Sequence, residues 1–120
     1  MKMDRLNPGL TPAADFAGGD TDIALWMSSR SETVAGLLKA LSHEGRLMIL
    51  CHLATGERSV TELEGLLGQR QAAVSQQLAR LRLEGLVTTR REGKAIFYAI
   101  LDPRILPLIR ALPELVGKTA

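Results

Sequence analysis

Apolar residues recur at helical spacing in two consecutive stretches of the first half of the chain. The stretch from Asp20 to Leu41 becomes periodic in its second half, where i, i+3, i+4, i+7 spacing is occupied by Val34, Leu37, Leu38 and Leu41. The same spacing recurs at Leu47, Leu50, Cys51 and Ala54. Because Ser42 is a suitable N-cap and Gly56 a suitable stop, the second stretch predicts a helix over roughly residues 43–54.

Two shorter amphipathic stretches follow. Ser59, with Glu62 three residues later, has the signature of a capping box and predicts a helix that ends at Gly68. A second helix is predicted over "QRQAAVSQQLARLRLEG", ending at Gly85. Its apolar face is formed by Val74, Leu78 and Leu81. Two short helices joined by a tight turn that contains glycine are typical of a helix-turn-helix.

The sequence pattern changes from helical to extended after this pair of helices. The segment "LVTTRREGKAIFYAIL" is rich in β-branched and aromatic residues and is interrupted by Glu92-Gly93. This composition predicts a β-hairpin with Glu92-Gly93 as its two-residue turn. A hairpin directly after a helix-turn-helix indicates a wing.

A last helix is predicted after the hairpin. Asp102 is a suitable N-cap, and Pro103 would occupy the first helical position. Pro107 and Pro113 lie further along, and we expect them to kink or shorten this helix. The order of elements therefore predicts a mainly α fold with a β-hairpin, a winged helix-turn-helix.

The two ends of the chain differ in pattern. Residues 1–19 are rich in Pro, Gly and Asp without periodicity and are expected to form a flexible N-terminal arm, which leaves 20–120 as the winged helix-turn-helix DNA-binding domain. The chain contains neither a signal-like apolar segment nor an 18-residue apolar run. A single cysteine excludes an intrachain disulfide and fits a reducing compartment. We therefore expect a cytoplasmic protein.

Basic residues are concentrated in one segment. The whole chain has a formal charge of only +2, and aromatic residues make up 3%, too few for a base-stacking surface. Residues 70–94, however, contain six Lys and Arg residues against two Glu residues, a local charge of 6 − 2 = +4. This segment predicts a surface that attracts phosphates.

The candidate DNA contacts lie on the second helix of the pair and on the wing. Gln71, Ser75 and Gln76 lie near the helix start, where recognition helices contact base edges, with Gln76 opposite the apolar face and Ser75 on its flank. We expect phosphates or guanine to be contacted by Arg70 and Arg80. The basic residues of the wing, which would meet the phosphate backbone or the minor groove, are Arg90, Arg91 and Lys94. The alternative is a solvated polar face on a winged-helix module that binds protein and not DNA.

Apolar residues outside the central segment exceed what one small core needs. They surround Trp26 and occupy the last helix at Ile105, Leu106, Leu108, Ile109, Leu112 and Leu115. We expect these two helices to pair across a two-fold axis in a homodimer. The alternative for Trp26 is simple core filling.

Residues 40–100 resemble the ArsR family of bacterial winged-helix repressors. The resemblance is carried by "AAVSQQLARLRLEGLV" followed by "RREGKAIFYAI" and is strongest to the persulfide-sensing BigR/SqrR type, to which HlyU and NolR are related. It implies a homodimeric repressor that binds pseudo-palindromic duplex DNA and leaves its operator when an inducer acts. It implies no enzymatic activity.

Metal sensing, common among members of the family, is not expected here. The thiolate site of the family would require cysteines where this chain has residues 60–63, and the site of its last helix would require Asp and His pairs after Asp102. The chain holds one Cys and two His in total, fewer than the three or four ligands that zinc requires. We expect no metal and no cofactor.

Cys51 is the candidate sensing residue. It matches the first of two cysteines in the BigR/SqrR type, but residues 114–117, where the second would fall, contain none. Four interpretations remain open: an inert packed thiol, a single thiol that forms a persulfide or sulfenate, a pair with the second Cys51 of a dimer, and a ligand for haem or contact for another small molecule. Catalysis by Cys51 is not expected, since His43 lies more than two helical turns away and no base and orienting group accompany the thiol.

Overall fold

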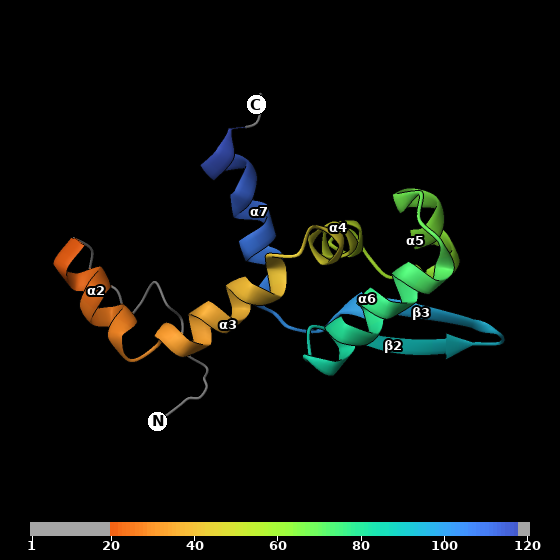
Figure 1. The fold of residues 1–120 in the computed structure, drawn as a ribbon, viewed down its shortest axis with the longest axis horizontal. Helices are drawn as coiled ribbons and strands as arrows, with labels where there is room; N and C mark the ends of the chain where they lie inside the picture. Colours follow the sequence, from red (N-terminus) through yellow and green to blue (C-terminus); the bar gives the residue numbers. More distant parts are fainter. Residues whose placement is uncertain (1–19, 118–120) are drawn as a thin grey trace. The chain divides into compact units, whose positions relative to one another are not determined.

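The computed structural model describes residues 20–117, which form six helices and three strands (Figure 1). The predicted N-terminal arm, residues 1–19, lies outside the described residues. The chain divides into two compact units, one up to Leu38 and one from Lys39 onward. Each is described by itself.

The first unit contains α2 (Asp20–Ser28) and most of α3 (Ser31–Leu41). Arg30, between the two helices, contacts Trp26 of α2. Its guanidinium carbon lies 4.7 Å from the centre of the Trp26 ring, and its Nη1 donates to the Trp26 carbonyl at 2.8 Å. The indole Nε1 is buried and has no hydrogen-bond partner among the described residues. The dimer and core interpretations of Trp26 both stay predictions.

The second unit opens with α4 (Glu44–Leu53), and its cap differs from the prediction. The N-cap is His43, whose Nδ1 accepts a hydrogen bond from the Gly45 N–H at 3.1 Å. The prediction of Ser42 as N-cap is wrong, because its hydroxyl donates to the Lys39 carbonyl at 2.8 Å, at the end of the preceding helix. Histidine offers a ring nitrogen as acceptor, a cap that common N-cap preferences do not suggest.

The helix-turn-helix follows as α5 (Val60–Leu67) and α6 (Gln71–Leu83). The capping box is confirmed, since the Ser59 hydroxyl accepts from the Glu62 N–H and the Glu62 carboxylate accepts from the Ser59 N–H. Gly68 ends α5 in the left-handed conformation with φ 64°, which glycine adopts without steric cost. This turn sets the direction in which α6 leaves.

The core of the second unit is aliphatic and draws on α4, α5, α6, the first long strand of the wing and the last helix. Its fully buried side chains are Ile49, Leu50, Leu63, Val74, Leu78, Leu81, Val87 and Ile105. The three predicted inward residues of α6 are all among them. In α4, however, the buried face is Ile49, Leu50 and Leu53, so the predicted partners Leu47, Cys51 and Ala54 are only half-buried.

The wing is part of a three-stranded antiparallel sheet in the order β1-β3-β2. It consists of β1 (Arg58–Ser59), β2 (Val87–Glu92) and β3 (Ala95–Ile100). Glu92 pairs with Ala95, so the two-residue turn is Gly93-Lys94 and the predicted Glu92-Gly93 turn is wrong by one position. Gly93 has φ 62°, which a primed hairpin turn requires at its first position.

The last helix, α7 (Ile105–Val116), begins two residues later than Asp102 and Pro103 predicted. Asp102 accepts the Arg104 N–H at 2.9 Å and closes a turn ahead of the helix. Pro107 is the third helical residue, where an N–H would have no partner within the helix, so it does not shorten α7. The helix also continues past Pro113 to Val116, so the expected shortening is wrong.

Candidate nucleic-acid interface

The face of α6 opposite its buried residues is small and polar near the start of the helix. Gln76 is exposed on this face, Ser75 is half-buried on its flank, and Gln71 is exposed at the first helical position. Ala72 and Ala79 are exposed on the same side. The structure therefore confirms which way α6 faces: aliphatic side chains point inward, while amides with little bulk around them point to solvent.

Arg70 and Arg80 lie at the two ends of this face. Arg70 occupies the N-cap position of α6, is exposed, and has no ion-pair partner within residues 20–117. Arg80 is also exposed, but its Nε lies 2.6 Å from Oε2 of Glu84, one turn further along. An exposed i, i+4 pair of this kind is weak, so it leaves Arg80 able to turn toward another anion.

The wing places its adjacent arginines on opposite faces of the sheet. In β2, Arg91 shares a face with the buried Val87, the residue that packs against the core, whereas Arg90 lies on the other face. Lys94 occupies the turn at the tip. Arg91 and Lys94 are exposed and have no carboxylate partner in the described part of the chain. The wing therefore presents two cations that are not already paired.

Arg90 is held by the protein itself. Its guanidinium pairs with the carboxylates of Glu57 and Glu92 and lies 4.7 Å from the centre of the Phe97 ring. The hydrogen bond from Arg90 lowers the pKa of Glu57, which keeps that carboxylate charged. Sequence reasoning missed Glu57 because it is 33 residues from Arg90, and only the sheet register brings the two together.

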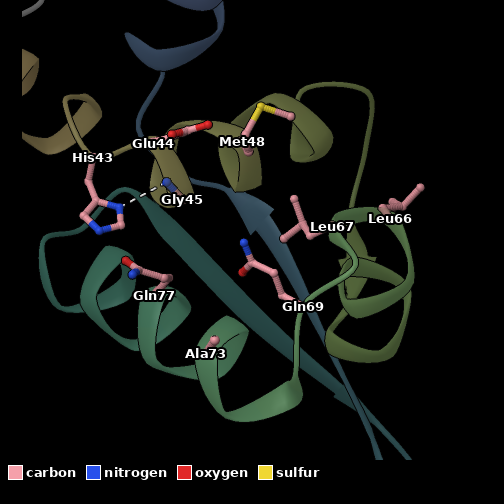
Figure 2. Close-up of a pocket in the computed structure, with 9 residues that line it drawn as sticks. All are labelled: His43, Glu44, Gly45, Met48, Leu66, Leu67, Gln69, Ala73 and Gln77. Carbon is pink, nitrogen blue, oxygen red and sulfur yellow. Dashed lines mark hydrogen bonds between the residues drawn. The ribbon is translucent and has the colours of Figure 1, made fainter.

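A groove lies beside α6 and was also missed (Figure 2). It encloses about 730 Å³ and is lined by His43, Glu44, Gly45, Met48, Leu66, Leu67, Gln69, Ala73 and Gln77. Figure 2 shows His43 and Gln77 at one end and Leu66 at the other. A Cβ on Gly45 would lie 3.1 Å from Cε1 of His43, so the glycine allows the capping ring to lie against the helix. The groove is open and mixes amide, carboxylate and aliphatic groups.

Cys51 is a free thiol on α4 and is half-buried. Burial raises the pKa of the thiol, so the thiolate fraction at neutral pH is lower than that of an exposed cysteine. Within residues 20–117, no group of three or more His, Cys, Asp and Glu side chains is placed to hold a metal ion. None of the described helices combines the length and the apolar character needed to cross a membrane.

Comparison with known proteins gives concordant matches. A sequence profile described as "Bacterial regulatory protein, arsR family" matches residues 43–89. The biofilm growth-associated repressor of Agrobacterium fabrum is 52% identical over 86 residues, which are 72% of this chain and 74% of that protein. The transcriptional activator HlyU of Vibrio cholerae is 43% identical over 89 residues, 74% of this chain and 82% of that protein.

Solved structures match a similar share of the chain. The transcriptional repressor BigR from Xylella fastidiosa superimposes with a TM-score of 0.72 at 47% identity, covering 75% of this chain and 92% of that one. The match therefore extends beyond the helix-turn-helix to most of that repressor. The relatives include both a repressor and an activator. The similarity therefore supports a role in transcriptional regulation and does not decide between repression and activation.

Proposed function

Because this chain belongs to the arsR family of bacterial regulatory proteins, we propose that it regulates transcription as a homodimer that grips duplex DNA with α6 and the wing. It is a DNA-binding transcriptional regulator of the winged helix-turn-helix class. The observation that carries the assignment of the DNA face is the outward side of α6, where Gln76, Ala72 and Ala79 are exposed opposite three fully buried aliphatic residues.

Base recognition is assigned to the N-terminal half of α6. Gln71 and Gln76 carry amides that can pair in bidentate fashion with adenine, and Ser75 can hydrogen-bond to several base edges. Ala72 supports this role because a methyl group allows the helix to enter a major groove about 12 Å wide. Arg70 and Arg80 flank these residues and are assigned to phosphates or guanine.

Phosphate contacts of the wing are assigned to Arg91 and Lys94. Both are exposed and lack an acidic partner among the described residues, so neutralising a phosphate would break no existing ion pair. A cation at a hairpin tip can reach the backbone beside the groove that α6 occupies, as wings do.

Dimerisation is assigned to the apolar helices at the two ends. Leu115 is 76% exposed and Val116 72% exposed, so two adjacent aliphatic side chains lie on the surface at the end of α7. Two copies related by a two-fold axis would cover these residues and double the number of base contacts, which matches recognition of a pseudo-palindromic site. We propose the same role for the helix around Trp26.

Variants of α6 and the wing test the assignment of the DNA face. We expect Arg80→Ala and Lys94→Ala each to weaken binding to duplex DNA by about 3- to 30-fold and to flatten its dependence on salt. Each variant loses a phosphate contact, so fewer counterions are released from the DNA on binding. Fluorescence anisotropy with a labelled duplex measures both quantities. Affinity and salt dependence unchanged in both variants would show that another surface contacts DNA.

The rival function is a winged-helix module that binds protein without DNA. It predicts that the wild-type chain has no salt-dependent affinity for duplex DNA, so the same titration separates the two classes.

A further inference from the structure

Arg90 uses every nitrogen of its guanidinium on carboxylates of the protein. Nε donates to Oε2 of Glu57 at 3.2 Å and Nη2 donates to Oε1 of the same carboxylate, which forms a two-point contact. Nη1 donates to Oε1 of Glu92 at 3.1 Å. Paired hydrogen bonds of this kind fix the plane of both groups, which a single contact cannot do.

The side chain of Arg90 crosses the sheet on its way to Glu57. Arg90 lies on β2 directly opposite Phe97 of β3, and Phe97 is in turn opposite Ser59 of β1. Glu57 precedes Ser59 by two residues, so strand alternation places it on the same face. The guanidinium rests on the Phe97 ring, 4.7 Å from its centre, as it reaches across. One residue thus connects β2, β3 and the segment before β1.

The charge of this cluster is unsuited to phosphate. Arg90, Glu57 and Glu92 together carry a net charge of −1, and a phosphate would have to displace a carboxylate to bind the guanidinium. Arg91 and Lys94 belong to the same hairpin, but within residues 20–117 neither is paired with a carboxylate that a phosphate would have to displace. Two neighbouring arginines therefore have different environments, although both belong to the basic wing.

We propose that Glu57 and Arg90 form a clamp that sets the position of the wing against the segment before β1, and that Arg90 acts as a positioning residue and not as a phosphate contact. This inference rests on the proposed DNA-binding function. It reassigns one of the eight residues that the sequence marked as DNA contacts and adds Glu57, which the sequence did not mark. With the wing held in this position, Arg91 and Lys94 near the end of the hairpin are presented to DNA.

The test measures binding of a labelled mixed-sequence duplex over a range of salt concentrations. We expect Arg90→Ala, Arg90→Lys and Glu57→Gln each to weaken binding about two- to fivefold, the range of an exposed ion pair, without changing the slope of log K against log salt. Lys94→Ala is the matched control, and its slope should fall by about 0.9 for each phosphate that Lys94 contacts. The double variant Glu57→Gln/Arg90→Ala should bind no more weakly than Arg90→Ala alone.

Two of these variants separate the clamp from a phosphate contact. Arg90→Lys keeps the charge but loses the planar two-point contact, so a phosphate-binding role predicts nearly normal affinity and the clamp predicts a loss. Glu57→Gln removes a negative charge. If Glu57 only competes with phosphate for Arg90, this variant should bind DNA more tightly, whereas the clamp predicts weaker binding. Thermal unfolding monitored by circular dichroism should show that all variants fold.

The clamp is overturned if Arg90→Ala lowers the salt slope as Lys94→Ala does, if Arg90→Lys binds like the wild type, or if Glu57→Gln binds more tightly. These outcomes leave the DNA-binding function standing. A wild-type chain that shows no salt-dependent affinity would overturn that function and the clamp with it.

Discussion

At the scale of single residues, Cys51 shows how a local environment can decide chemistry. The resemblance of the sequence to the BigR/SqrR type predicts a sensing thiol at this position, but the sequence has no second cysteine to pair with it. Its half-buried position on α4 raises its pKa, which lowers the fraction of nucleophilic thiolate. These observations favour a packed thiol over a fast sensor of reactive sulfur.

We therefore expect DNA binding to be insensitive to the thiol. Wild type and Cys51→Ser should bind the same duplex with Kd values within about twofold of each other, before and after brief treatment with inorganic polysulfide or peroxide. Anisotropy titrations measure this, and mass spectrometry of the treated protein reports whether Cys51 was modified. Loss of binding by the treated wild type alone would show that one cysteine is enough for a switch.

At the scale of elements, some boundaries were readable from sequence and others were not. The faces of α6 followed from the spacing of Val74, Leu78 and Leu81, and the start of α5 from a capping box, because both signals lie within a few residues. The caps of α4 and α7 were misjudged because His43 and a turn closed by Asp102 replace the expected caps. The hairpin turn was one residue off, since register depends on pairing with β3.

Two glycines of one helix should respond oppositely to alanine. Gly68→Ala should lower the free energy of unfolding by about 1 kcal/mol, because φ 64° is unfavourable for a residue with a Cβ although the space around it is open. Gly65→Ala, inside α5 and equally unobstructed, should raise it by up to about 1 kcal/mol through helix propensity.

Urea denaturation of the two variants and the wild type provides the comparison. Equal effects of the same sign would contradict the assigned end of α5, and with it the turn that aims α6.

At the scale of the whole molecule, the wing is joined to the segment before β1 by a contact between residues far apart in sequence. The sequence shows that residues 70–94 are basic, but not which of these residues are paired within the protein, because Arg90 meets Glu57 only through a three-stranded register. Amino-acid spacing reports which face a residue occupies and says little about which distant charge occupies the same face.

The proposed dimer depends on the exposed apolar end of α7. Leu115→Glu should weaken self-association at least about tenfold, because it places a charge in an interface that would otherwise exclude water. Leu83→Glu is the matched control: Leu83 is 83% exposed at the end of α6 and belongs to no proposed interface, so its variant should associate like the wild type. Sedimentation velocity measures both. Equal association in all three proteins would place the dimer interface elsewhere.

The most direct test of the central claim is the salt dependence of duplex binding by the wild-type protein. Four basic residues assigned to DNA in each of two protomers, Arg70, Arg80, Arg91 and Lys94, predict that log K falls linearly with log salt, with a slope of up to about −7. A slope near zero, or no affinity for duplex DNA at low salt, would contradict the account.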